Sequence, residues 1–165
     1  MAFPTMCSAL AIRDIEDFFA IPELRELAER AGVVSIPEVL LHGEEESEYL
    51  KPMQPGGRYK VESRVKDVSD KGKMCIVAIE KLISCEEGHV YSKIITRFVL
   101  RGVRAEGHKG GLIEPMELPK APDRQPDERV DSIKILPYQN ALYRLTGDKN
   151  LIHIDPKVAA NAGFP

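Results

Sequence analysis

The chain has 165 residues, a length that suits one domain or one and a half small ones. Its 43% apolar and 30% charged residues are typical of an ordinary globular protein and exclude a disordered one. The net charge of −3 lacks the basic excess of a nucleic-acid binder, and no apolar stretch approaches the roughly 18 residues that span a bilayer, so neither partner is expected.

Residues 1–37 are predicted to be helical with interruptions. The segment PELRELAERAG has Pro22 in its first turn and ends at Gly32, as an amphipathic helix would. Its apolar positions at helical spacing are Leu24, Leu27, Ala28 and Ala31. One apolar face and one charged face predict a helix that covers a core.

From residue 38 to 104 the apolar period changes to two, which predicts strands. A strand near 38–49 precedes a half-buried strand over 58–65, and DVSDKGK (67–73) is predicted to be a turn. MCIVAIEKLIS follows as a more fully buried strand, CEEGH turns at Gly88, and VYSKIITRFVL (90–100) is the next strand. Long antiparallel strands beside a helix predict an α+β fold, with a curved sheet packed on the helix.

Residues 101–128 are rich in glycine and proline and are predicted to form a partly extended linker. After it, DSIKIL (131–136) has the pattern of a short strand and PYQNALYRL that of a helical or mixed segment. DPKVAANAG predicts a short helix, with Asp155 as N-cap, Pro156 in the first turn and Gly163 at the C-cap.

Polar side chains concentrate in the stretch LYRLTGDKNLIHID, between two of these elements. Gly147 permits a sharp turn, so Asp148, Asn150 and His153 can point into one space. A carboxylate and an imidazole that converge can hold a water and exchange protons with it near neutral pH. Asn150 could position that water or fix the tautomer of His153.

Simpler interpretations of this stretch compete with an active site. A calcium loop starting at Asp148 fails because Ile152 occupies its fifth position. His153-x-Asp155 is not followed by another ligand, so no metal is expected. On spacing alone a structural interpretation is favoured, with Asp148 as a turn residue, Asp155 as a cap and His153 as a satisfied polar contact.

The three cysteines, Cys7, Cys75 and Cys85, have no CxxC spacing, which favours a reducing compartment and excludes a recognisable zinc cluster. Cys75 lies in the apolar run MCIVAI and is expected to be a small buried hydrophobe.

A resemblance to a known family favours an active site over the structural interpretation of this stretch. YRLTGDKNLIHIDPKVAANAGF resembles the hydratase 2 motif of the MaoC-like family, which reads aromatic, apolar, Ser/Thr, G-D-x-N-P-apolar-H and then a small residue. The matching residues are Tyr143, Leu145, Thr146, Gly147, Asp148, Asn150, Ile152, His153 and Ala159. Leu151 departs from the usual proline, which loosens the loop but changes no polar group. Upstream, residues 39–88 are similar to the N-terminal half of the peroxisomal (R)-specific enoyl-CoA hydratases.

The resemblance implies two hot-dog folds in tandem, each a curved antiparallel sheet wrapped on a helix. Residues 1–104 would form the first repeat, 105–128 the linker and 129–165 the start of the second repeat. The implied reaction is syn hydration of trans-2-enoyl-CoA to (3R)-hydroxyacyl-CoA in fatty-acid β-oxidation. No cofactor is implied, because coenzyme A is part of the substrate.

The resemblance also assigns roles to residues. Asp148 and His153 would be the catalytic pair, with Asn150 supporting them. Gly147 and the segment His42, Gly43 and Glu44 are predicted to bind substrate, and a catalytic role of Glu44 is an alternative. For the segment, strand or turn structure or a contact that supports the second repeat is the favoured explanation. A peroxisomal location is implied, with the cytoplasm as the alternative, and the partner would be a second copy or the second repeat.

Compared with that family, the chain is expected to be truncated at both ends. In that family, the backbone N–H that donates to the thioester oxygen lies in the helix after the motif, which this chain is expected to lack. Loss of such a donor costs about 10²–10³ in rate. Low activity of the chain alone is therefore expected. Two other functions remain open: a non-catalytic module that binds acyl thioesters or dimerises, and a MaoC-like dehydratase acting on other acyl thioesters.

Overall fold

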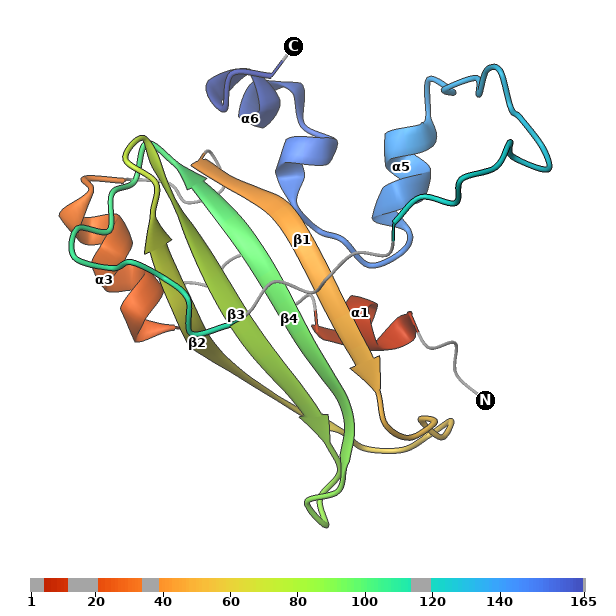
Figure 1. Cartoon of the computed structure of the whole chain (residues 1–165), viewed down its shortest axis with the longest axis horizontal. Coiled ribbons are helices and arrows are strands. Elements are labelled where there is room, and N and C mark those ends of the chain that lie inside the picture. The colour runs from red at the N-terminus through yellow and green to blue at the C-terminus, as the bar shows by residue number, and fades with distance from the viewer. Residues whose placement is uncertain (1–4, 12–20, 34–38, 114–119, 165) are drawn as a thin grey trace.

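A four-stranded antiparallel sheet forms the centre of the chain (Figure 1). The computed structural model describes residues 5–11, 21–33, 39–113 and 120–164. The strands are β1 (Leu40–Tyr49), β2 (Lys60–Asp70), β3 (Met74–Ser84) and β4 (Val90–Arg101), in the order β1-β4-β3-β2. The predicted α+β class is confirmed.

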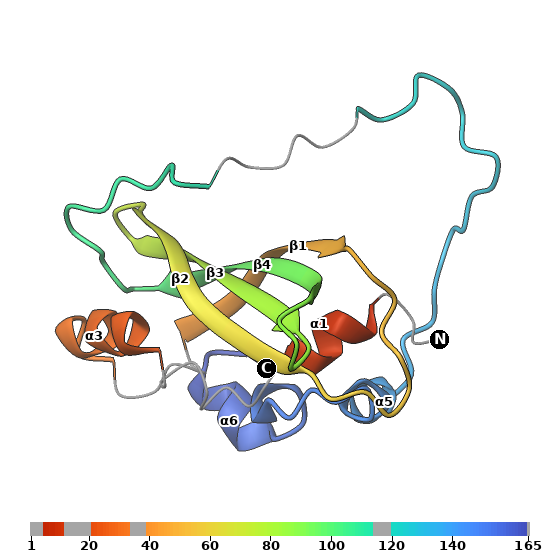
Figure 2. The same cartoon turned by 90° about the horizontal axis from the view of Figure 1, so that it is seen from below.

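Short helices accompany the sheet. They are α1 (Met6–Ala11), α3 (Pro22–Arg30), α5 (Gln139–Arg144), the 3₁₀ helix η1 (Leu151–His153) and α6 (Pro156–Asn161). In Figure 2, α1, α3, α5 and α6 lie below the sheet, while the residues that directly follow β4, up to 113, run above it. The helical character predicted for residues 12–20 and 34–37 lies outside the described residues.

Helix α3 forms where the sequence predicts it. Pro22 occupies the first turn, where its missing N–H costs no hydrogen bond, and Gly32 ends the helix with φ of 66°. Leu24, Leu27 and Ala28 are buried on one face, as their spacing requires. This helix therefore covers the sheet through a single apolar stripe.

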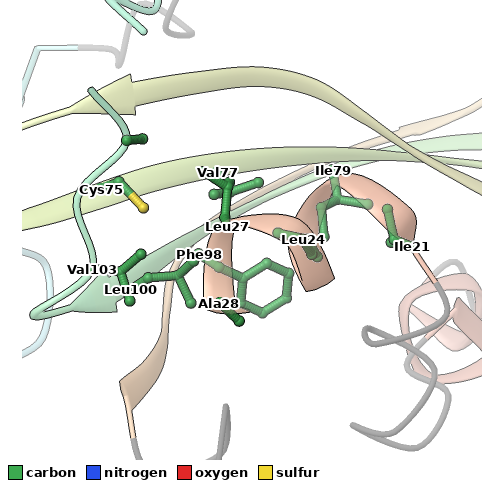
Figure 3. Close-up of a cluster of buried hydrophobic side chains, with 11 residues drawn as sticks. Ile21, Leu24, Leu27, Ala28, Cys75, Val77, Ile79, Phe98, Leu100 and Val103 are labelled. Carbon is green, nitrogen blue, oxygen red and sulfur yellow. The ribbon is translucent and has the colours of Figure 1, made fainter. Parts of the chain in front are cut away.

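Two apolar clusters hold the helices to the same face of the sheet. In the larger, α3 packs on alternate residues of β3 and β4 (Figure 3). Its members from the strands are Cys75, Val77, Ile79, Phe98 and Leu100. In the smaller, Cys7 and Ala11 of α1 pack on Met53, Ile83 and Ile94. Full burial of a large aliphatic side chain contributes roughly 1.5–3 kcal/mol, so these clusters are the main stabilising element.

Strand β2 is longer than predicted. The turn predicted over 67–73 is wrong at its start, because residues 67–70 continue the pairing with β3. The register shifts between Val65 and Asp67, so the bulge interrupts the alternation on which the prediction depended. The chain reverses at Gly72, whose φ is 81° and whose N–H donates to Asp70 Oδ1 at 2.6 Å.

A charge network lies on the other face of the sheet. The Glu80 side chain is only 3% exposed and accepts a hydrogen bond from Arg64 Nε at 2.7 Å. Lys66 Nζ and Lys93 Nζ lie 3.5 and 3.7 Å from its Oε2. Burial opposes ionisation, but the bond from Arg64 and the charges of Arg64, Lys66 and Lys93 outweigh it and lower the pKa of Glu80 below 4.5.

We expect Glu80→Gln to lower the free energy of unfolding at pH 7 by about 1–2 kcal/mol, because three cations lose their shared carboxylate. A lowered folded-state pKa stabilises the fold above the unfolded value of 4.5 and loses this effect as pH falls through the folded pKa. Urea titrations of the parent and the variant should therefore converge towards pH 3. A difference that is equally large at both pH values would contradict this account.

The beginning of the predicted linker is packed against β2. Val103 and Ala105 are buried, and Asp70 Oδ2 accepts from the Ala105 N–H at 3.1 Å. Asp67 Oδ2 accepts from the N–H groups of Gly111 and Leu112 at 2.9 and 3.2 Å. Residues 103–112 are thus anchored by two carboxylates of the edge strand.

The strand predicted over 131–136 is wrong. These residues have no strand pairing in the described part of the chain, and Ile133 and Ile135 are 80% and 79% exposed. The helices α5 and α6 form as predicted, yet neither they nor η1 contain a buried residue. Contact with the sheet includes Arg101, whose Nη2 donates to the Ala162 carbonyl at 3.1 Å.

Candidate active site

The motif stretch forms a tight loop after α5. Gly147 has φ of 113°, a conformation that side chains disfavour, and it directs the chain from the helix into the loop. Asn150 N–H donates to Asp148 Oδ1 at 2.8 Å, which closes a small turn around the carboxylate. The predicted role of Gly147 in the turn is therefore confirmed, while a role in substrate binding stays a prediction.

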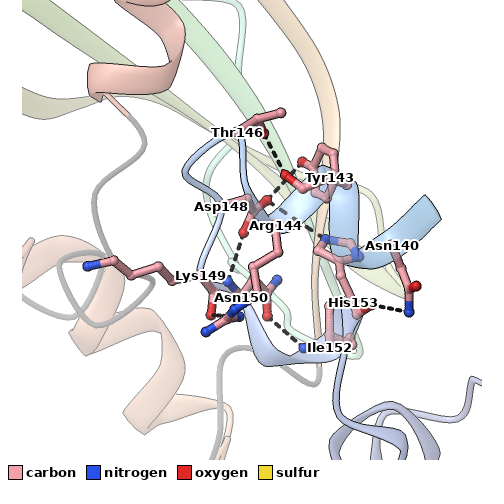
Figure 4. Close-up of polar contacts among 9 residues, drawn as sticks. All are labelled: Asn140, Tyr143, Arg144, Thr146, Asp148, Lys149, Asn150, Ile152 and His153. Atoms are coloured by element: carbon pink, nitrogen blue, oxygen red, sulfur yellow. Dashed lines mark hydrogen bonds and ion pairs between the residues drawn. The ribbon is translucent and has the colours of Figure 1, made fainter. Parts of the chain in front are cut away.

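Asp148 and His153 face each other across this loop (Figure 4). His153 Nε2 lies 4.0 Å from Asp148 Oδ2, and their side chains are 47% and 15% exposed. This separation is too long for a direct hydrogen bond. Two hydrogen bonds of about 2.8 Å that meet at a water at about 90° would span about 4.0 Å. The geometry therefore suits a single water held between the carboxylate and the imidazole.

Asn150 uses its side chain within the loop. Its Oδ1 accepts from the Ile152 N–H at 3.1 Å and so caps η1. The described contacts of this side-chain oxygen stabilise the segment that delivers His153. A role in positioning water or fixing the tautomer of His153 stays a prediction.

Asp155 is a helix cap. Its Oδ1 accepts from the N–H groups of Lys157 and Val158 at 2.8 and 3.3 Å, and Pro156 follows in the first turn of α6. Gly163 has φ of 79° just after the helix. Both predicted ends of this helix are confirmed, so Asp155 is explained by its structural role.

Comparison with known protein families accounts for both halves of the chain. Residues 11–102 match the family described as MFE-2 hydratase 2 N-terminal domain, and residues 117–165 match the family described as MaoC like domain. The chain belongs to the MaoC-like hydratase 2 family. The loop from Tyr143 to His153 lies within the segment that matches the MaoC like domain.

Named relatives of this family agree. The enoyl-CoA hydratase ChsH3 of Mycobacterium tuberculosis is 38% identical over 76% of this chain and 43% of its own length. The structure of a MaoC-like dehydratase from Phytophthora capsici matches with a TM-score of 0.58 at 34% identity, over 79% of this chain and 45% of that chain. The full-length peroxisomal multifunctional enzyme type 2 of Drosophila melanogaster matches with a TM-score of 0.59 at 33% identity, over 89% of this chain and 25% of that chain.

These matches confirm the predicted hot-dog fold. The chain spans less than half the length of the relatives named above.

The segment His42–Glu44, which is predicted to bind substrate, lies in β1. The strand bulges between His42 and Glu44, and a Cβ added to Gly43 would lie 3.1 Å from the Arg97 carbonyl oxygen. Glu44 Oε1 lies 3.2 Å from Arg97 Nη1, and the His42 ring lies 5.4 Å from the Phe98 ring. The antiparallel pairing of β1 with β4 explains these contacts. Binding of substrate by His42, Gly43 and Glu44 stays a prediction.

The thiol of Cys75 lies outside the motif, in the core between α3 and the sheet. Burial, together with the charge of Asp70, raises the pKa of the Cys75 thiol to about 11, so it remains protonated at neutral pH. Among the described residues, no group of three His, Cys, Asp or Glu side chains could hold a metal ion. The described helices include none long and apolar enough to cross a membrane.

A described cavity lies away from the motif. It has a volume of about 310 Å³ and opens between α3, β2 and the anchored segment 103–112. Its lining residues are Glu23, Glu26, Leu27, Arg30, Val65, Lys66, Asp67, Val68, His108 and Leu112. The motif contributes none of these lining residues.

Sequence reasoning gave no role to several residues that support the loop. Asn140 Nδ2 donates to the His153 carbonyl at 3.2 Å, and Arg144 Nη1 donates to the Lys149 carbonyl at 3.2 Å. Tyr143 was matched only as an aromatic position, yet its hydroxyl donates to Asp148 Oδ2 at 2.8 Å. The available signal was the position of all three on α5, directly before the glycine turn.

Proposed function

We propose that this chain carries the water-activating pair of an (R)-specific enoyl-CoA hydratase. The observation that supports this function is the 4.0 Å approach of His153 Nε2 to Asp148 Oδ2 within the hydratase 2 motif. The proposed substrate is a trans-2-enoyl-CoA thioester, and the product is a (3R)-hydroxyacyl-CoA.

The reaction adds one water across a double bond. The water held by Asp148 and His153 gives a proton to one member of the pair as its oxygen bonds to C3. The pair returns a proton to C2 on the same face of the alkene, so atoms and charges balance. Between these two transfers the thioester carbonyl of the substrate takes up the electron pair of the alkene. The reaction needs no redox step, so no cofactor is proposed beyond the coenzyme A of the substrate.

The partners and location of this activity are proposals too. We propose that the exposed 129–164 segment associates with a second copy or with a second hot-dog repeat. The organelle proposed is the peroxisome, as in the Drosophila relative, with the cytoplasm as the alternative. The division into a first repeat (1–104), a linker (105–128) and the start of a second repeat (129–165) is likewise proposed, and the two separate family matches support it.

A second candidate is a dehydratase of other acyl thioesters. The match of residues 117–165 to the MaoC like domain and the similarity to a MaoC-like dehydratase favour it. The two candidates share the same proton transfers in opposite directions. They differ in the thioester that the chain processes.

The test is a hydration assay of the chain with crotonyl-CoA at high protein concentration. The enoyl absorbance reports turnover, and chiral analysis identifies the product. We expect turnover above the buffer rate and a (3R) product. A (3S) product, or no turnover, would overturn the proposal. Binding of crotonyl-CoA without turnover would favour a non-catalytic acyl-thioester module, and turnover of only acyl-carrier-protein thioesters would favour the second candidate.

A further inference from the structure

Tyr143 contacts both members of the proposed pair. Its hydroxyl donates to Asp148 Oδ2 at 2.8 Å, and its ring meets the His153 ring edge-on, with centroids 5.3 Å apart and planes at 85° (Figure 4). The Tyr143 side chain therefore links Asp148 at the start of the loop with His153 at its end. Neither contact belongs to helix α5 itself, on which Tyr143 lies.

Helix α5 holds the loop on which the pair lies. Thr146 Oγ1 donates to the Tyr143 carbonyl at 2.7 Å, on the turn before Asp148. The bonds from Arg144 to the Lys149 carbonyl and from Asn140 to the His153 carbonyl fix two further points of the loop. The ring of Tyr143 is therefore placed by a helix that also determines the path of the loop around it.

The two oxygens of Asp148 have different donors. Oδ1 accepts from the backbone N–H of Asn150, and Oδ2 accepts from the hydroxyl of Tyr143. Two donors from different directions fix the rotation of the carboxylate, which the backbone bond alone does not. Since Oδ2 is also the atom nearest His153 Nε2, the hydroxyl determines where a shared water can bind.

The hydroxyl remains a donor over the physiological range. Its hydrogen bond to Asp148, then burial and the charge of that carboxylate, raise the pKa of Tyr143 above its ordinary value of 10.0. The phenol is therefore protonated at neutral pH. It does not compete with the pair for the proton of the water.

We propose that Tyr143 is a positioning residue that holds Asp148 and His153 in the geometry for water activation. This inference rests on the proposed function. It deepens that function by assigning the orientation of the pair to a hydroxyl outside it. A phenylalanine at this position would keep the ring contact with His153 and remove only the bond to Oδ2.

The test compares Tyr143→Phe with the parent and with Tyr138→Phe, which changes an exposed tyrosine at the start of α5. We expect Tyr143→Phe to lower kcat for crotonyl-CoA about 10- to 100-fold, because the displacement of a reacting group by about 1 Å costs up to about 10² in rate. KM and the Tm should stay at the parent values, and Tyr138→Phe should match the parent in all three. An unchanged kcat in Tyr143→Phe, or a loss of kcat that is accompanied by a lowered Tm, would overturn the positioning role.

A second measurement needs no turnover. Ring-labelled tyrosine followed by NMR against pH should show that Asp148→Asn lowers the pKa of Tyr143 towards its ordinary value. An unchanged Tyr143 titration would overturn the contact and the positioning role with it. If Tyr143 responds but the parent hydrates no enoyl-CoA, the proposed function has failed and the positioning role falls with it. If the parent turns over and Tyr143→Phe equals it, only the positioning role is overturned.

Discussion

Replacing Asp148 by Asn is expected to lower crotonyl-CoA hydration by about 10²–10⁴-fold, which is the usual contribution of a positioned acid or base. The amide has nearly the same shape as the carboxylate, but it carries no charge and cannot accept a proton from water. His153→Gln should have an effect of similar size, because it removes the other side of the water site. The measurement is kcat/KM from the loss of enoyl absorbance.

The double variant Asp148→Asn/His153→Gln separates a working pair from two independent contacts. If both side chains hold the same water, the double variant should be no slower than the slower single variant. Asp155→Asn is the matched control, since it makes the same chemical change seven residues later and asparagine also caps a helix. Parent-like rates in Asp148→Asn, or equal losses in Asp155→Asn, would contradict the assignment.

The sequence predicted those elements whose pattern is decided locally. Helix α3 follows from Pro22, a stripe of apolar residues at helical spacing and Gly32. Strand β3 is correct because its buried side chains form a run that turns bound on both sides. In each case the residues that end the element are as informative as those inside it.

The two errors share a physical cause, which is that pairing depends on distant residues. Asp67 to Asp70 have the composition of a turn, yet they pair with β3 beyond a bulge that no local pattern announces. Residues 131–136 have the alternation of a strand, but alternation forms a strand only where another strand offers its hydrogen bonds. Among the described residues the sheet ends at β1 and β2, and the segment pairs with neither.

The candidate site divides in the same way. The spacing of the motif pointed to Asp148 and His153, and the structure brings them to 4.0 Å. The spacing could not predict the hydrogen bond from Tyr143 to Asp148, because this contact depends on where α5 ends and on the φ of Gly147. Asn150 shows the opposite case, since its described contact is a cap that any turn of this type would use.

Replacing Ile79 by Ala is expected to lower the free energy of unfolding by about 2–5 kcal/mol, a large part of the roughly 5–15 kcal/mol of a typical domain. Ile79 is buried in the cluster between α3 and the sheet, so its truncation leaves a cavity under the helix (Figure 3). Ile79→Val removes one methyl group and should cost only about 0.5–1.5 kcal/mol. Urea unfolding measures both, with the midpoint shifting at constant slope.

Ile135→Ala is the matched control for this substitution, because the same side chain is 79% exposed there. Its cost should stay within about 0.5 kcal/mol, as for other surface changes. The two variants together therefore test whether the free energy of unfolding depends on the core between α3 and the sheet and not on Ile135. A loss in Ile135→Ala as large as that in Ile79→Ala would contradict this picture, since it would require Ile135 to be covered in solution. Repeating the titration at several protein concentrations then decides whether a second copy covers it, because only in that case does the loss depend on concentration.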